Sequence, residues 1–65
     1  MVHWKVLPGG GLIHRKTGYD ITLRWIVNGN PERPVEDHIL EKNWATEEVM
    51  VELIEYCDLQ RAKQN

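Results

Sequence analysis

The sequence has few of the side chains that perform covalent or metal chemistry. Its 65 residues include one cysteine, Cys57, and neither serine nor phenylalanine. One cysteine cannot close a disulfide within the chain, and a serine nucleophile is excluded. A zinc site takes three or four protein ligands, often paired cysteines, whereas the histidines at positions 3, 14 and 38 are scattered. We therefore expect no metal and no cofactor, and we expect the chain not to be an enzyme.

Long apolar runs are also missing. No uninterrupted apolar stretch exceeds a few positions, so the sequence predicts no segment that spans a membrane. A secretory signal peptide has a charged start followed by an apolar stretch, and the sequence does not begin with this pattern. Together with the single cysteine, these features favour a cytoplasmic location.

The remaining composition is that of a small folded domain. Hydrophobic residues make up 42% of the chain and charged residues 28%, and we expect residues 1–65 to form one domain. A chain of this size buries only about 60% of its unfolded surface, so its stability is small unless something adds to the core. We therefore expect a homodimer, with contacts from an uncovered sheet face that carries Ile26 and Leu7.

Residues 1–30 have the pattern of a β meander. Val2–Leu7 alternates apolar and polar side chains, and Leu12–His14 is a second short strand. Tyr19–Val27 alternates again and is rich in β-branched and aromatic residues, which predicts the third strand. Gly18 can supply a positive φ in the turn before it.

Residues 31–65 have the pattern of a helical pair. Pro34 suits the start of a first helix, and Thr46 suits the cap of a second one. No proline or glycine separates the two helices, so one long helix bent near Asn43 is an alternative. Two apolar pairs, each four residues apart, would form the buried stripe of the first helix: Val35 with Ile39, and Leu40 with Trp44.

These patterns predict an α+β fold. We expect a small N-terminal antiparallel β-sheet of two to three strands packed against two C-terminal helices. Cys57 falls on the apolar arc of the second helix, with carboxylates nearby. Both features raise the pKa of a thiol, so we expect a buried and unreactive cysteine.

The two halves of the chain differ in charge. Residues 1–30 carry four basic residues and one acidic residue, a net charge of +3. Residues 31–65 carry four basic and nine acidic residues, a net charge of −5. Such asymmetry bears on which partners a protein attracts, so each half suggests its own binding hypothesis.

The acidic hypothesis concerns the outer side of the second predicted helix, where carboxylates stand among apolar residues. A row of carboxylates attracts a basic partner, and exposed apolar neighbours often mark an interface. We therefore expect a small regulatory or interaction protein that binds another protein. Its predicted docking residues are Glu48, Glu52, Glu55, Val51 and Leu59.

The alternative hypothesis is nucleic-acid binding through the basic hairpin of the first half. Its predicted residues, Arg15, Lys16 and Arg24, lie near aromatic residues in the sequence. Basic groups beside aromatic rings hold single strands by charge and by base stacking. Against this, the aromatic residues share a predicted strand face with apolar ones, and the whole chain has a net charge of −2.

Overall fold

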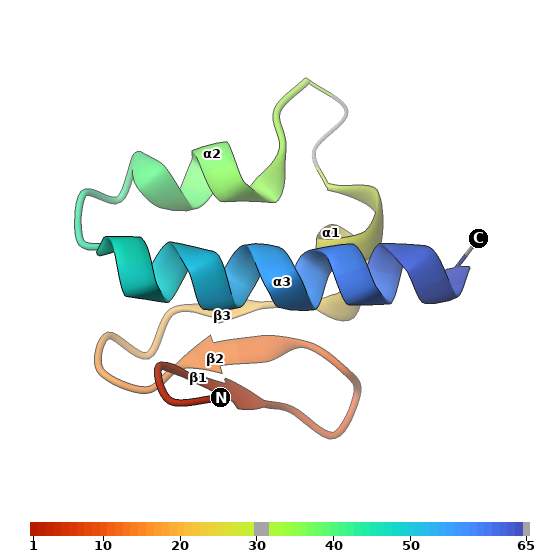
Figure 1. Cartoon of the computed structure of the whole chain (residues 1–65), viewed down its shortest axis with the longest axis horizontal. Helices are drawn as coiled ribbons and strands as arrows, with labels where there is room; N and C mark the ends of the chain where they lie inside the picture. Colours follow the sequence, from red (N-terminus) through yellow and green to blue (C-terminus); the bar gives the residue numbers. More distant parts are fainter. Residues whose placement is uncertain (30–31, 65) are drawn as a thin grey trace.

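The computed structural model, which describes residues 1–29 and 32–64, contains a three-stranded sheet and three helices in those ranges (Figure 1). Helix α3 runs across the middle of the molecule, with α2 on one side of it and the sheet on the other. The expected α+β fold, an N-terminal antiparallel sheet packed against C-terminal helices, is confirmed. The elements are β1 (Trp4–Val6), β2 (Leu12–His14), β3 (Asp20–Ile21), α1 (Leu23–Asn28), α2 (Val35–Leu40) and α3 (Glu47–Gln64).

The sheet is antiparallel and has the order β1-β2-β3, so β1 and β3 are its edges. Trp4 is opposite His14, and Leu12 is opposite both Val6 and Ile21. These five side chains share the face that packs toward the helices, because residues opposite each other or two apart lie on one face. The other face carries Lys5, Ile13 and Asp20.

Glycine is needed in both connections of the sheet. Gly18 has a φ of 76°, so it supplies the positive φ expected in the turn before β3. A Cβ on Gly11 would lie only 2.5 Å from the backbone oxygen of Ile21, whereas one on Gly9 would meet nothing. The turn between β1 and β2 is therefore packed closely against β3.

The predicted strand Tyr19–Val27 is wrong beyond β3, because helix α1 follows. Thr22 caps this helix, and its Oγ1 accepts a hydrogen bond from the Trp25 N–H at 3.3 Å. Gly29, with a φ of 66°, ends it. Ile26, expected on an uncovered sheet face, is buried in the core, so the face proposed for a dimer contact does not exist in that form.

The two predicted C-terminal helices are present, and the alternative of one bent helix is wrong. Asn43 has a φ of 59°, in the left-handed region, and lies between α2 and α3. Thr46 caps α3 as predicted, since its Oγ1 accepts a hydrogen bond from the Val49 N–H at 3.4 Å. The pairing of Leu40 with Trp44 is wrong, because Leu40 is 53% exposed and Trp44 lies beyond the end of α2.

The core lies between the helices and the inner face of the sheet. The Trp4 Nε1–H donates a hydrogen bond to the Val49 oxygen at 3.0 Å, which ties β1 to α3. Cys57 is fully buried, and burial raises the pKa of its thiol to about 12, as expected for an unreactive core residue. The buried apolar residues are Trp4, Leu12, Ile21, Ile26, Val35, Ile39, Val49, Met50, Leu53 and Cys57.

Arg61 joins the three helices near the end of α3. Its Nε donates to the Ile26 oxygen in α1 at 2.9 Å, and its Nη1 donates to a Glu36 carboxylate oxygen in α2 at 2.9 Å. The Arg61 guanidinium is therefore part of the fold rather than a free surface charge. Within the described ranges, none of the helices is long and apolar enough to cross a membrane.

Candidate functional site

A groove lies between the N-terminal segment and the first half of α3. Its volume is about 650 Å³, and one wall consists of residues 1–3. The other wall comes from α3, where residues three or four positions apart line up on one face. The α3 residues that line the groove are Glu47, Glu48, Val51, Glu52 and Glu55.

Glu52 holds the N-terminal segment against α3. Both of its carboxylate oxygens accept the His3 backbone N–H, at 3.0 and 3.2 Å, and one lies 2.5 Å from the His3 Nδ1. Burial of the Glu52 carboxyl opposes ionisation. Hydrogen bonds from the His3 ring and from the backbone of His3 and Val2 outweigh burial and lower the pKa of Glu52 below its usual value. Glu52 therefore holds the two walls of the groove together, and its carboxylate is already hydrogen-bonded to His3.

Apolar side chains line both walls of the groove, beside exposed carboxylates of α3 that form an acidic rim. Val2 is 79% exposed and Val51 is 48% exposed, and the exposed Met1 side chain lies beside them. The carboxylates of Glu47, Glu48 and Glu55 are exposed along the same wall. An apolar surface rimmed by one sign of charge suits a partner that carries apolar and basic side chains together.

The structure thus brings together four of the five predicted docking residues. Leu59 is exposed, but it lies two turns beyond Val51 on α3 and does not line the groove. Sequence reasoning missed the opposite wall, residues 1–3. The contact between His3 and Glu52 joins positions 49 residues apart, and no local pattern marks such a pairing.

The basic residues of the alternative hypothesis do not form one surface. Arg15 and Lys16 lie in the turn after β2 and line a smaller hollow of about 370 Å³ together with Trp44. This hollow adjoins the groove, because Val2, His3 and Glu48 line both. Arg24 lies in α1 and lines a different cleft. In Figure 1 the turn after β2 and helix α1 lie at opposite ends of β3. His14, next to Arg15 in the sequence, is buried and adds nothing to a basic surface.

His14 has a structural role. It accepts a hydrogen bond at Nδ1 from the Thr17 N–H at 3.1 Å, and its ring packs against Trp44 with the ring centres 4.4 Å apart. Burial, with a smaller contribution from His3, lowers the pKa of His14 below its usual value. The side chain therefore belongs to an aromatic cluster at one end of the sheet.

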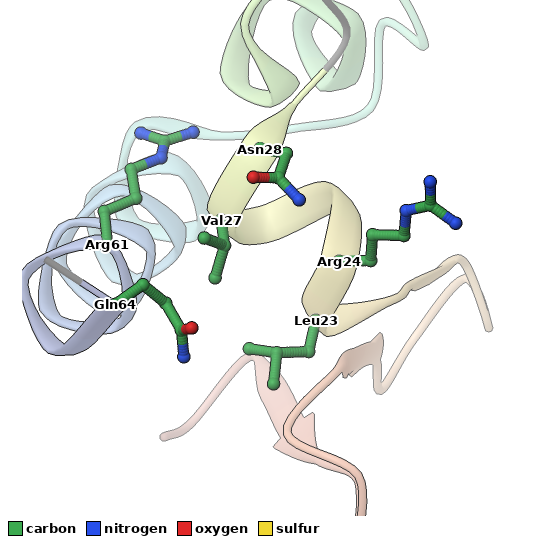
Figure 2. A pocket seen from close by; sticks show the side chains of 6 residues that line it. All are labelled: Leu23, Arg24, Val27, Asn28, Arg61 and Gln64. Carbon is green, nitrogen blue, oxygen red and sulfur yellow. The ribbon is translucent and has the colours of Figure 1, made fainter.

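A second cleft, of about 640 Å³, separates α1 from the end of α3 (Figure 2). The side chains of Leu23, Val27 and Gln64 point into it, and the guanidinium of Arg24 points away from it. The other arginine at its border, Arg61, is bonded to Ile26 and Glu36. The C-terminal end of α3 also disfavours an anion, so this cleft does not resemble an anion site.

Among residues 1–29 and 32–64, no group of three or more His, Cys, Asp or Glu side chains is placed to hold a metal ion. Comparison with protein-family models, with curated proteins and with solved structures found no significant match to this chain. Inference about its function therefore depends on its own surface.

Proposed function

We propose that this chain is a small, non-enzymatic cytoplasmic interaction protein that docks another protein at the groove between residues 1–3 and α3. The observation that carries the proposal is the exposed apolar lining of Met1, Val2 and Val51 beside three exposed carboxylates. None of these apolar side chains is needed for the core, because each is at least 44% exposed. Exposed apolar side chains that cluster in one place are typical of an interface.

The chemistry of the groove favours a basic partner. The exposed carboxylates of Glu47, Glu48 and Glu55 would attract Lys or Arg side chains over a distance and speed association. A standard interface covers about 800 Å² on each partner, or about a fifth of the 4457 Å² that this chain exposes. The contact would therefore extend along α3 beyond the groove, as far as the exposed Leu59.

The test compares two matched triple variants. Glu47→Gln, Glu48→Gln and Glu55→Gln remove the charge of the rim but leave the paired carboxylate of Glu52 in place. Arg15→Gln, Lys16→Gln and Arg24→Gln remove three charges from side chains that do not line the groove. Of these, Arg15 donates one exposed hydrogen bond to the Met1 oxygen at 3.4 Å. A protein retained from the native cells by the wild-type chain is identified and purified, and its affinity for all three chains is measured at several salt concentrations.

Docking at the groove predicts that the acidic triple variant binds at least about tenfold more weakly and loses most of the salt dependence. The basic triple variant should bind like the wild type. Equal binding by the wild type and the acidic triple variant would refute the groove as the docking site.

Nucleic-acid binding is the second candidate, now reduced to Arg15 and Lys16. One observation favours it, the half-buried Trp44 ring that lines a hollow with these two residues. Aromatic rings beside basic side chains stack with bases. A mixed single-stranded oligonucleotide that binds the wild type and the acidic triple variant, but not the basic one, would favour this function over docking.

The homodimer remains a prediction. Two copies joined groove to groove would bring two acidic rims together, which costs free energy. A dimer would therefore use another surface, and the groove would stay free for a different protein. Light scattering at several concentrations distinguishes a monomer from a particle of twice the mass.

A further inference from the structure

The outer face of α3 alternates acidic and apolar side chains from one turn to the next. Glu48, Val51, Glu55 and Leu59 are all exposed, and successive members are three or four residues apart. Each residue of a helix advances about 100°, so these positions fall within an arc of about 80° and form one outer stripe. At a rise of about 1.5 Å per residue, the outer stripe is roughly 16 Å long. It begins in the groove and continues past it to Leu59.

This surface offers a partner side chains rather than free backbone groups. The N–H and C=O groups of α3 are bonded to one another along the outer stripe, as in any α-helix. On the opposite wall, the His3 N–H donates to Glu52, and the His3 oxygen accepts from the Arg15 N–H at 3.0 Å. Trp4, the next residue, is fully buried, so its backbone cannot bond an added strand. An extended partner would therefore find no ladder of hydrogen bonds here.

A helical partner suits the same surface. A helix bonds its own N–H and C=O groups internally, and it presents side chains at the three- and four-residue spacing of the outer stripe. Two packed helices lie about 8–10 Å apart, and they stay in contact over several turns when they cross at about 20°. Amphipathic helices dock in apolar grooves in this way. The outer stripe and the exposed apolar side chains of Met1 and Val2 have the arrangement of such a groove.

We propose that the docked partner binds as a basic amphipathic helix that lies along the outer stripe of α3. This inference rests on the proposed function and specifies the form of the partner. The contact face of the partner helix would place apolar side chains against Val51 and Leu59. Lys or Arg side chains of the same face would lie against Glu48 and Glu55.

Charge and length argue against a second copy of this chain as the docked helix. Two α3 helices packed by their outer stripes would bring the carboxylates of both copies together, and the outer stripe contains no basic residue to offset them. Helices α1 and α2 have six residues each, or about 9 Å, and are too short to follow the outer stripe. The docked helix should therefore come from a different protein, one that carries Lys or Arg.

The experiment uses a synthetic peptide of about 16 residues, long enough as a helix to cover the outer stripe. Leucine and lysine alternate at successive turns of one face, and alanine and glutamine fill the other positions. Two variants of this parent peptide each replace one alanine, away from the contact face, by proline. Proline in the middle breaks a helix and should weaken binding about tenfold or more. Proline at the first helical position is the matched control and should change the affinity less than about twofold.

Two leucines of the chain provide a matched pair of variants. Leu59 and Leu40 are 54% and 53% exposed, but Leu59 lies on the outer stripe and Leu40 lies at the end of α2. Leu59→Ala should weaken the parent peptide about fivefold or more, because the docked helix would cover the exposed part of this side chain. Leu40→Ala should change the affinity less than about twofold. Equal effects of the two substitutions would overturn docking along the outer stripe.

Binding is measured by fluorescence anisotropy with a labelled peptide. The ¹³Cα chemical shifts of an isotope-labelled peptide add a second measurement, because they report the backbone conformation of the bound peptide. Helical shifts from the first lysine to the last are expected in a saturated complex. Extended or unstructured shifts over these residues would overturn the helical form of the partner.

Failure of this inference can be distinguished from failure of the proposed function. Equal binding of the two proline peptides would overturn helical docking. If the acidic triple variant still weakened the parent peptide, docking at the groove would stand. A parent peptide that does not bind would also overturn helical docking, and the affinity of the purified cellular partner for the acidic triple variant would then decide the proposed function alone.

Occupation of the outer stripe by a second copy has its own signature. Light scattering would then show a particle of twice the mass that dissociates when the parent peptide is added. That result would overturn the assignment of the outer stripe to a different protein. A mass that is the same with and without unlabelled competitor chain, together with peptide binding, is the expected outcome.

Discussion

The two faces of α3 differ in burial, although they belong to one helix. Its inner face carries Val49, Leu53 and Cys57, which are buried against the sheet and the other helices. Its outer face carries Val51 and Leu59, about half exposed and separated by carboxylates. The comparison shows that apolar residues on one helix need not all serve the core. Those on the outer face are available to a partner, so substitutions there should affect binding and leave folding unchanged.

The largest effect should follow from shortening one apolar residue on each face. Leu53→Ala removes a fully buried side chain and should lower the free energy of unfolding by about 2–5 kcal/mol. Val51→Ala, on the outer face, should change it by less than about 0.5 kcal/mol. Urea unfolding of both variants measures the difference. A similar loss in both would show that the outer face also supports the fold.

The two basic residues near the end of α3 should differ in the same way. Arg61→Met removes the bonds to Ile26 and Glu36 and leaves a mostly buried carboxylate without its partner. We expect a loss of about 1–3 kcal/mol in the free energy of unfolding. Lys63→Met, at an exposed position, is the control and should be neutral within about 0.5 kcal/mol. Equal stability of the two variants would contradict the role given to Arg61.

Two glutamates on the groove wall, Glu52 and Glu55, should differ in how much their charge stabilises the fold. The pKa of Glu52 is lowered in the folded chain, so its ionised form stabilises the fold above the usual carboxyl pKa. Glu52→Gln should therefore lower the free energy of unfolding by about 1 kcal/mol at neutral pH. This cost should shrink as the pH falls through the folded pKa of Glu52, because the wild-type carboxylate is then protonated. Glu55→Gln should change stability little at any pH, and urea unfolding from neutral to acidic pH tests both variants.

The parts of the fold that were predictable have strong local signals. Alternation identified β1, and Leu12–His14 was expected as a short strand after the glycine run, as β2 is. Thr46 with its two following glutamates identified the start of α3. Cys57 was placed correctly in the core, because the apolar arc of a long helix indicates which side is buried.

Helix α1 was missed because its sequence satisfies two patterns at once. Ile21, Leu23, Trp25 and Val27 alternate like a strand, yet a six-residue helix follows Thr22. Thr22 caps α1 as Thr46 caps α3, but no acidic residue occupies the first turn of α1 to strengthen the signal. The tertiary contact of Ile26 with the core favours the helix, and such contacts are not visible in a short sequence window.

The candidate site was predictable in part. The α3 wall follows from helical spacing, and Glu48, Val51 and Glu55 were identified from the sequence alone. The role of Glu52 in holding residues 1–3 could not be predicted from the sequence. A glutamate that accepts a hydrogen bond from a distant backbone N–H has the same sequence pattern as an exposed glutamate. The separation of Arg24 from Arg15 and Lys16 likewise follows from α1, which the sequence pattern concealed.

Mapping of backbone amide NMR shifts while the purified partner is added tests the central claim most directly. Docking at the groove predicts that the largest shifts occur in residues 1–6 and along the outer face of α3 from Glu47 to Leu59. Residues of the turn after β2 and of α1 should shift little. Large shifts confined to Arg15, Lys16 and Trp44, or to α1, with none at Val2 or Val51, would contradict it.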